Sequence, residues 1–142
     1  MKYWFIRSPF KTRKWEDILM SGVFNLYGIR NYSAKNNIAK IKKGDMALWY
    51  SSSAGKMIYG TMQAKDNAFV DKTSSNGWLS IDFIPQTSLT TPVRLTTIKQ
   101  NKKFDDSNIL KQQRISVINI SKIEYEEILR IAYANPIFFN TL

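Results

Sequence analysis

Short apolar runs separated by small and polar residues dominate the chain, and runs of that length predict buried strands. The first run is rich in aromatic residues and stops at Ser8-Pro9. The small, polar segment 51–56 separates two further runs and is typical of the connection in a hairpin. Pro85 is expected to close a fourth run. The expected strands are residues 3–6, 46–50, 57–62, 78–84 and 115–118, with a short extended piece at 91–95.

Helical spacing of apolar residues marks three other segments, and each has a capping signal at its start. Residues 27–32 show neither period and carry Gly, Arg and Asn together, so we expect a loop there. The order of strand, two helices, several strands and a final helix excludes regular βαβ alternation and predicts one α+β domain over residues 1–142. The expected helices begin at Thr12, Ser33 and Ser121 and end at Gly22, at Gly44 and before Pro136.

The charge balance favours a polyanionic partner. The chain has 142 residues, with 21 Lys and Arg against 11 Asp and Glu, which gives a net charge of +10. A lysine-rich solvated surface, common in proteins of AT-rich bacterial genomes, is the alternative explanation. Composition therefore permits nucleic acid as a partner without requiring it.

Several classes of chemistry are excluded. The chain has no Cys and no His, which removes disulfides, thiolate metal sites and the usual general base at neutral pH. The carboxylates form no spaced pair typical of a nuclease or glycosidase. Ala54-Gly55-Lys56 lacks the remaining residues of a phosphate-binding loop. We therefore expect a protein that is not an enzyme and needs no cofactor or metal. The first apolar run stops at Arg7, too short for a signal peptide or membrane span, so a cytoplasmic protein is expected.

Two motifs resemble the EVE domain family. Residues 3–9 (Tyr-Trp-Phe-Ile-Arg-Ser-Pro) are similar to the family's first strand, and residues 28–36 (Gly-Ile-Arg-Asn-Tyr-Ser-Ala-Lys-Asn) are similar to its Gly-Val-Arg-Asn-Tyr loop. Further similar segments follow in the family's order over residues 3–130: Lys43-Gly44-Asp45, Trp49-Tyr50-Ser51-Ser52, Trp78 with Ile81-Asp82, Pro92-Val93-Arg94-Leu95 and Arg114-Ile115-Ser116-Val117.

The resemblance implies a PUA-like fold: a strongly bent sheet or pseudo-barrel of about five to six strands with flanking helices, related to the YTH readers of methylated RNA. It also implies a pocket between the barrel and the first helices that accepts one flipped, modified base of DNA or RNA. Departures from the family pattern fall near that pocket. They are Pro9-Phe10 in place of an acidic residue, Tyr27 in place of Trp, Ser51 in place of His and Ile118 in place of Gln.

The residue types present suit a base reader, because a flipped base is held by stacking on rings and by short polar groups at its edge. By analogy with the YTH readers, Phe83 takes the position of a cage tryptophan. The alternative for each ring is a place in the core, for Asn31 a bond to loop backbone, for Ser8 a turn, and for Arg114 an internal carboxylate. The expected pocket residues are Trp4, Ser8, Tyr27, Gly28, Ile29, Arg30, Asn31, Tyr32, Tyr50, Ser51, Ser52, Trp78, Phe83, Arg114 and Ser116, with Trp49 as a further candidate ring. The expected phosphate contacts are Arg7, Lys35, Lys40, Lys42 and Lys43, extended by Lys102 and Lys103.

Two other functions remain open at this stage. One is a base- or nucleoside-processing hydrolase like those of the related ASCH branch, whose Gly-x-Lys-x-x-Glu-x-Arg pattern this chain lacks. The other is the binding of a free, nucleotide-like metabolite. Oligomeric state is not indicated by the sequence.

Overall fold

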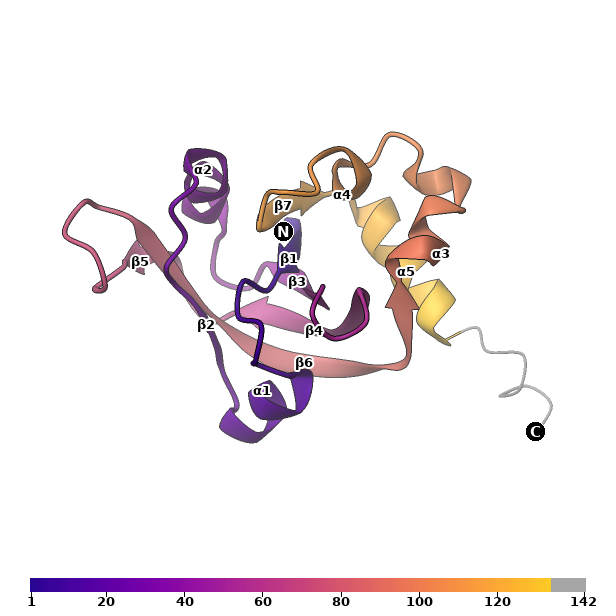
Figure 1. Ribbon diagram of the computed structural model, residues 1–142, viewed down its shortest axis with the longest axis horizontal. Helices are drawn as coiled ribbons and strands as arrows, with labels where there is room; N and C mark the ends of the chain where they lie inside the picture. Colours follow the sequence, from indigo (N-terminus) through magenta and orange to yellow (C-terminus); the bar gives the residue numbers. More distant parts are fainter. Residues whose placement is uncertain (134–142) are drawn as a thin grey trace.

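The structure is a computed structural model that describes residues 1–133 (Figure 1). Its centre is one curled, mixed sheet in the order β2-β6-β4-β3-β1-β7, a half-barrel with helices on its flanks. This confirms the expected α+β class and the bent sheet of about six strands. A two-residue strand, β5, adds to β6. The strands are β1 (Tyr3–Arg7), β2 (Phe24–Leu26), β3 (Met46–Ser51), β4 (Met57–Ala64), β5 (Phe69–Val70), β6 (Leu79–Arg94) and β7 (Val117–Ile120).

Strand β1 lies between β3, to which it is parallel, and β7, to which it is antiparallel. Its run of aromatic and β-branched residues is buried on both faces, as the sequence predicts. The parallel pairing brings the ends of β1 and β3 together, where Ser8 N donates to Tyr50 O over 2.9 Å. On the other side Arg7 N donates to Ser116 O over 2.8 Å. Segments far apart in sequence therefore meet at the C-terminal end of β1.

Strand β6 runs through Pro85, so the expectation that this proline ends the strand is wrong. Pro85 pairs with Met62 where the register between β4 and β6 shifts. A proline lacks a backbone N–H, and an irregularity in the ladder tolerates that loss. The strand then continues to Arg94 and includes the expected extended piece at 91–95 except Leu95, which begins the next helix.

The helices are short, and their termini differ in part from expectation. Gly22 ends the first helix in a left-handed conformation (φ 76°), and Ser121 and Glu124 form the expected capping box. The second helix is capped by Asn31 rather than Ser33 and ends at Lys40, so Gly44 lies in the following turn. The helices are α1 (Trp15–Ser21), α2 (Tyr32–Lys40), α3 (Leu95–Lys99), α4 (Asn108–Lys111) and α5 (Lys122–Tyr133), with a 3-10 turn η1 at Lys102–Phe104. Lys14, not Thr12, stands before α1, and Pro136 lies outside the described residues.

Apolar side chains fill two regions, one on each side of the sheet. Trp4, Trp15 and Trp49 belong to the interior of the half-barrel, while Phe5 and Ile128 belong to the layer between the sheet and α5. Within residues 1–133, no helix combines the length and apolar character needed to cross a membrane.

Candidate functional site

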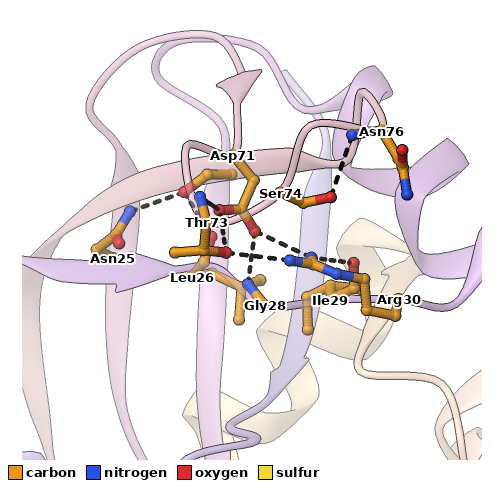
Figure 2. Close-up of polar contacts among 10 residues, drawn as sticks. Asn25, Leu26, Gly28, Ile29, Arg30, Asp71, Thr73, Ser74 and Asn76 are labelled. Carbon is orange, nitrogen blue, oxygen red and sulfur yellow. Dashed lines mark hydrogen bonds and ion pairs between the residues drawn. The ribbon is translucent and has the colours of Figure 1, made fainter.

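The β2–α2 loop, residues 27–31, is fixed in place by one buried carboxylate, that of Asp71 (Figure 2). Its Oδ2 accepts from Gly28 N over 2.8 Å and from Arg30 Nη1 over 3.0 Å. Its Oδ1 accepts from the N–H and the hydroxyl of Thr73. The same hydroxyl oxygen accepts from Arg30 Nη2 over 3.0 Å. Gly28 has φ 76°, a conformation that favours glycine and turns its N–H toward the carboxylate. We call Gly28, Arg30, Asp71 and Thr73 the loop lock.

Asp71 is held as a charged carboxylate. Its side chain is 1% exposed, and burial alone would raise its pKa. The hydrogen bonds from Thr73, Gly28 and Arg30 outweigh that effect and lower the pKa of Asp71 well below its ordinary value. The loop is therefore anchored by a permanent negative charge at neutral pH.

Exposed rings stand on both sides of the loop lock. Tyr27 is 42% exposed and leans on Phe10, with ring centroids 4.9 Å apart. Tyr32, at the start of α2, is 71% exposed and leans on Trp78 at the same separation. Cations lie over the Trp78 ring as well: Arg30 Cζ at 5.7 Å and Lys35 Nζ, from α2, at 5.4 Å. Two aromatic surfaces therefore lie at the ends of this loop, and the one formed by Tyr32 and Trp78 has positive charge beside it.

The Asn31 side chain has a structural role. Its Oδ1 accepts from Ala34 N over 2.9 Å and caps α2. The Arg30 guanidinium likewise donates hydrogen bonds within the protein, to Asp71, to Thr73 and to the carbonyl oxygen of Ile29. The two residues in the most diagnostic part of the motif therefore shape the loop, and neither lines one of the hollows described next.

A hollow of about 360 Å³ opens beside Tyr27, and we call it the Tyr27 hollow. Tyr27 and Phe69 supply its rings, and Phe69 is 41% exposed. Asn25 Nδ2 donates to Ser80 Oγ and to Asp82 Oδ1, over 2.9 and 2.7 Å, so both amide protons are used. No donor of residues 1–133 reaches Asn25 Oδ1, which remains as an acceptor. The lining residues are Asn25, Tyr27, Phe69, Asp71, Lys72, Thr73 and Ser80.

Two further hollows have different chemistry. The first, of about 380 Å³, contains the predicted residues Arg7, Tyr50 and Ser52 together with other basic residues at the opposite end of β6. The second, of about 510 Å³, lies between α2 and β7 and is lined mostly by amides, with one serine, one lysine and one isoleucine. The lining residues of the second are Ser33, Asn36, Asn37, Lys40, Asn108, Gln112, Ile115 and Asn119. Neither offers an exposed ring comparable to Tyr27.

Four of the expected pocket rings or apolar residues lie in the core instead. Phe83 and Trp49 have no exposed surface, and Trp4 and Ile29 have 1% and 5%. Trp4 also donates its Nε1 proton to buried Asp45 over 3.1 Å. The expectation that Trp4, Ile29 and Phe83 wall a pocket is corrected accordingly, because all three side chains pack in the apolar interior of the half-barrel.

The remaining predicted residues are dispersed. Ser8 Oγ accepts from Phe10 N, and Ser51, 1% exposed, accepts from Ala54 N, so both support turns. Arg114 is exposed and Ser116 half-buried at the start of β7, and no carboxylate of residues 1–133 pairs with Arg114. Lys40, Lys42 and Lys43 share a shallow hollow with Asp45. Lys102 and Lys103 lie in η1, where Lys103 Nζ is 3.4 Å from Glu127 Oε1.

Asn25, Phe69 and Asp71 line the Tyr27 hollow but were not predicted from the sequence. An asparagine between two apolar strand residues, Phe24 and Leu26, was the available signal for a polar group on the outer face. No comparable signal marks Asp71, because its partners in the β2–α2 loop, Gly28 and Arg30, are about forty residues away in sequence.

Comparison with known proteins agrees with this fold. The model of the EVE domain family matches residues 2–131. The crystal structure of Atu2648 from Agrobacterium tumefaciens is 28% identical, with a TM-score of 0.88 over 96% of this chain and 97% of that one. No curated protein sequence matches the chain.

Two more distant structures share the fold and contain nucleic acid. Human THYN1, in complex with DNA containing 5-methylcytosine, is 19% identical, with a TM-score of 0.86 over 96% of this chain and all of that one. The YTH domain of the MRB1 protein of Zygosaccharomyces rouxii, in complex with N6-methyladenosine RNA, is 11% identical, with a TM-score of 0.60 over 92% of this chain and 86% of that one.

Proposed function

The chain belongs to the EVE domain family, and from that premise we propose that it is a non-catalytic reader of nucleic acid that holds one flipped, modified base in the Tyr27 hollow. The observation that carries the proposal is the hollow itself, which is lined by two exposed rings and by Asn25, whose Oδ1 accepts from no donor of residues 1–133. Structures of similar fold were solved with a methylated cytosine in DNA and a methylated adenosine in RNA, which supports a methylated base as the ligand.

The size and lining of the hollow suit a base. Its volume of about 360 Å³ falls in the range of small-molecule sites. Stacking of a base on an aromatic ring contributes roughly 1–3 kcal/mol, which offsets the few kcal/mol that extrusion from a duplex costs. Tyr27 can contribute this energy because Phe10 supports its ring from behind.

The polar groups favour a base with an amino group. Asn25 Oδ1 accepts a hydrogen bond, and both adenine and cytosine carry an exocyclic amine that donates one. Lys72, at the rim, adds a positive charge for a neighbouring phosphate. The loop lock keeps Tyr27 at a fixed position before the ligand arrives, which lowers the entropy cost of binding.

The test is a titration of fluorescent oligonucleotides of one sequence, with and without 5-methylcytosine or N6-methyladenine, at fixed salt. Burial of one methyl group contributes about 0.8 kcal/mol, so roughly fourfold tighter binding of one modified form is expected. Tyr27→Ala should abolish the preference, while Tyr133→Ala, which changes an exposed tyrosine on α5, should keep it. Equal affinity of the wild-type protein for modified and plain strands would refute base reading, and modified nucleosides converted to product would refute the non-catalytic part.

A further inference from the structure

The hollow at the C-terminal end of β6 gathers positive charge without any balancing carboxylate, and we call it the Arg94 hollow. Its volume is about 380 Å³. Arg7, Lys56, Arg94 and Lys99 line it, and none of its lining residues is acidic. The other lining residues are Tyr50, Ser52, Gly55, Leu95, Thr96 and Gln113.

Backbone contacts hold these cations together. Leu95 N donates to Lys56 O over 3.0 Å, and Arg94 pairs with Met57 across the β4–β6 ladder, so Lys56 and Arg94 are fixed as neighbours. Lys99 follows on α3 one turn later. Within residues 1–133, no ion pair involves these three side chains. Like charges held side by side repel, and an anion placed between them would remove that cost.

Arg7 contributes a positive charge whose position in the hollow is fixed by hydrogen bonds. Its guanidinium donates to the carbonyl oxygens of Gln112 and Ile115 over 2.8 and 2.9 Å and to that of Ile109. It also lies over the Phe5 and Tyr50 rings, at 5.0 and 5.9 Å from their centroids. The charge therefore stays in place while the long side chains of Lys56, Arg94 and Lys99 remain exposed and free to close on a ligand.

From this arrangement we infer that the Arg94 hollow is a binding site for a phosphate group, separate from the Tyr27 hollow. Arginine and lysine bind phosphate by charge-assisted hydrogen bonds, and the hydroxyls of Ser52 and Thr96 add neutral donors. Ser80 lines the Tyr27 hollow and Arg94 lines this one, so the two sites lie near opposite ends of one strand (Figure 1). The phosphate belongs either to a polynucleotide or to a free nucleotide, and these sources present the same chemistry.

The test follows backbone amide NMR signals during titration with inorganic phosphate, adenosine 5′-monophosphate and adenosine. Phosphate and the monophosphate should shift the signals of residues 55–57 and 94–99 in a saturable way, whereas adenosine should not. Arg94→Gln with Lys99→Gln should weaken binding about tenfold or more. Lys65→Gln with Lys122→Gln removes the same charge at exposed lysines elsewhere and should change affinity less than twofold.

An oligonucleotide then distinguishes the sources. Competition with phosphate at residues 94–99 identifies a polynucleotide, and undisturbed phosphate binding in its presence identifies a free ligand. Both outcomes support the site. Shifts that never saturate, or that are equally reduced in the two double variants, would overturn it as general charge attraction. Tyr27→Ala should leave these titrations unchanged, so failure of the base-reading proposal and failure of this one are distinguishable.

Discussion

The guanidinium of Arg30 lies 3.0 Å from the carboxylate of Asp71, and the two groups differ sharply in exposure, at 39% and 1%. The buried carboxylate holds the Arg30 guanidinium in place, and the same guanidinium lies over the Trp78 ring. This pair joins the β2–α2 loop to the segment that leads into β6. Arg30, whose side chain is of a type that binds phosphate, is therefore already paired with a carboxylate of the protein itself.

Asp71→Asn should destabilise the protein by about 2 kcal/mol. The change removes the charge that compensates Arg30 and disturbs the bonds to Gly28 and Thr73. Urea unfolding at pH 7 measures the effect. Asp106→Asn, in a 96% exposed side chain that pairs with Lys111, serves as the matched control and should change stability by less than about 0.5 kcal/mol. Similar losses in both variants would contradict the loop lock.

Stability should fall in acid because of Glu127. Hydrogen bonds from Arg130, Asn101 and Lys103 lower the pKa of this buried carboxyl to about 2, against an ordinary value of 4.5. A carboxyl whose pKa is lowered by folding stabilises the protein above pH 4.5, and that stability is lost as the pH falls toward 2. The lowered pKa of Asp71 acts in the same direction.

Urea midpoints recorded between pH 7 and pH 2.5 test this pH dependence. Glu127→Gln should be less stable than the wild type at pH 7, and the difference should shrink as the pH falls. A constant difference across this range would mean that Glu127 does not stabilise the fold through its charge.

Gly60→Ala should be among the most damaging small substitutions. A Cβ at this position would lie 2.0 Å from the Trp15 ring, which is buried and bonded to Ser88 Oγ. Overpacking of this kind costs typically 1–3 kcal/mol or more. Gly77→Ala meets no atom within 4 Å and suffers only from its φ of 74°, so it separates backbone strain from collision. Thermal unfolding of the two variants should rank Gly60→Ala as clearly less stable.

Binding of oligonucleotides should weaken as salt rises, and Lys35 should contribute to the slope. Each phosphate contact changes the slope of log affinity against log salt by about one. Lys35→Gln should lower the slope by roughly that amount, whereas Lys122→Gln, whose side chain pairs with Glu126 on α5, should leave it unchanged. Affinity independent of salt would argue against phosphate contacts and favour the alternative of a free, nucleotide-like metabolite as the ligand.

Sequence alone predicted the parts of the fold that depend on local pattern. The run Tyr3–Ile6 is a strand, and Ser121 with Glu124 caps a helix, because each signal lies within a few residues. The passage of β6 through Pro85 depends on a register shift against β4, and no local pattern reports that. The orientation of Phe83 depends on the curvature of the whole sheet, so an expected pocket ring became a core residue.

The site was predicted less completely for the same reason. Tyr27 and Tyr32 stand beside a loop that the motif identifies, and both are exposed. Phe69 and Asp71 come from a distant segment, and only folding brings them against that loop.

Strand β1 pairs with two strands that lie far from it in the sequence. Tyr3 lies opposite both Met46 and Ile120, so β1 acquires its second neighbour, β7, only after the long segment between them has been synthesised. Pairings between such remote segments slow folding, because a long loop must close before they form. A nascent or truncated chain that lacks β7 would present β1 as an open edge rich in aromatic residues. Such an edge readily joins strands of other molecules, so incomplete chains should depend on chaperones during synthesis.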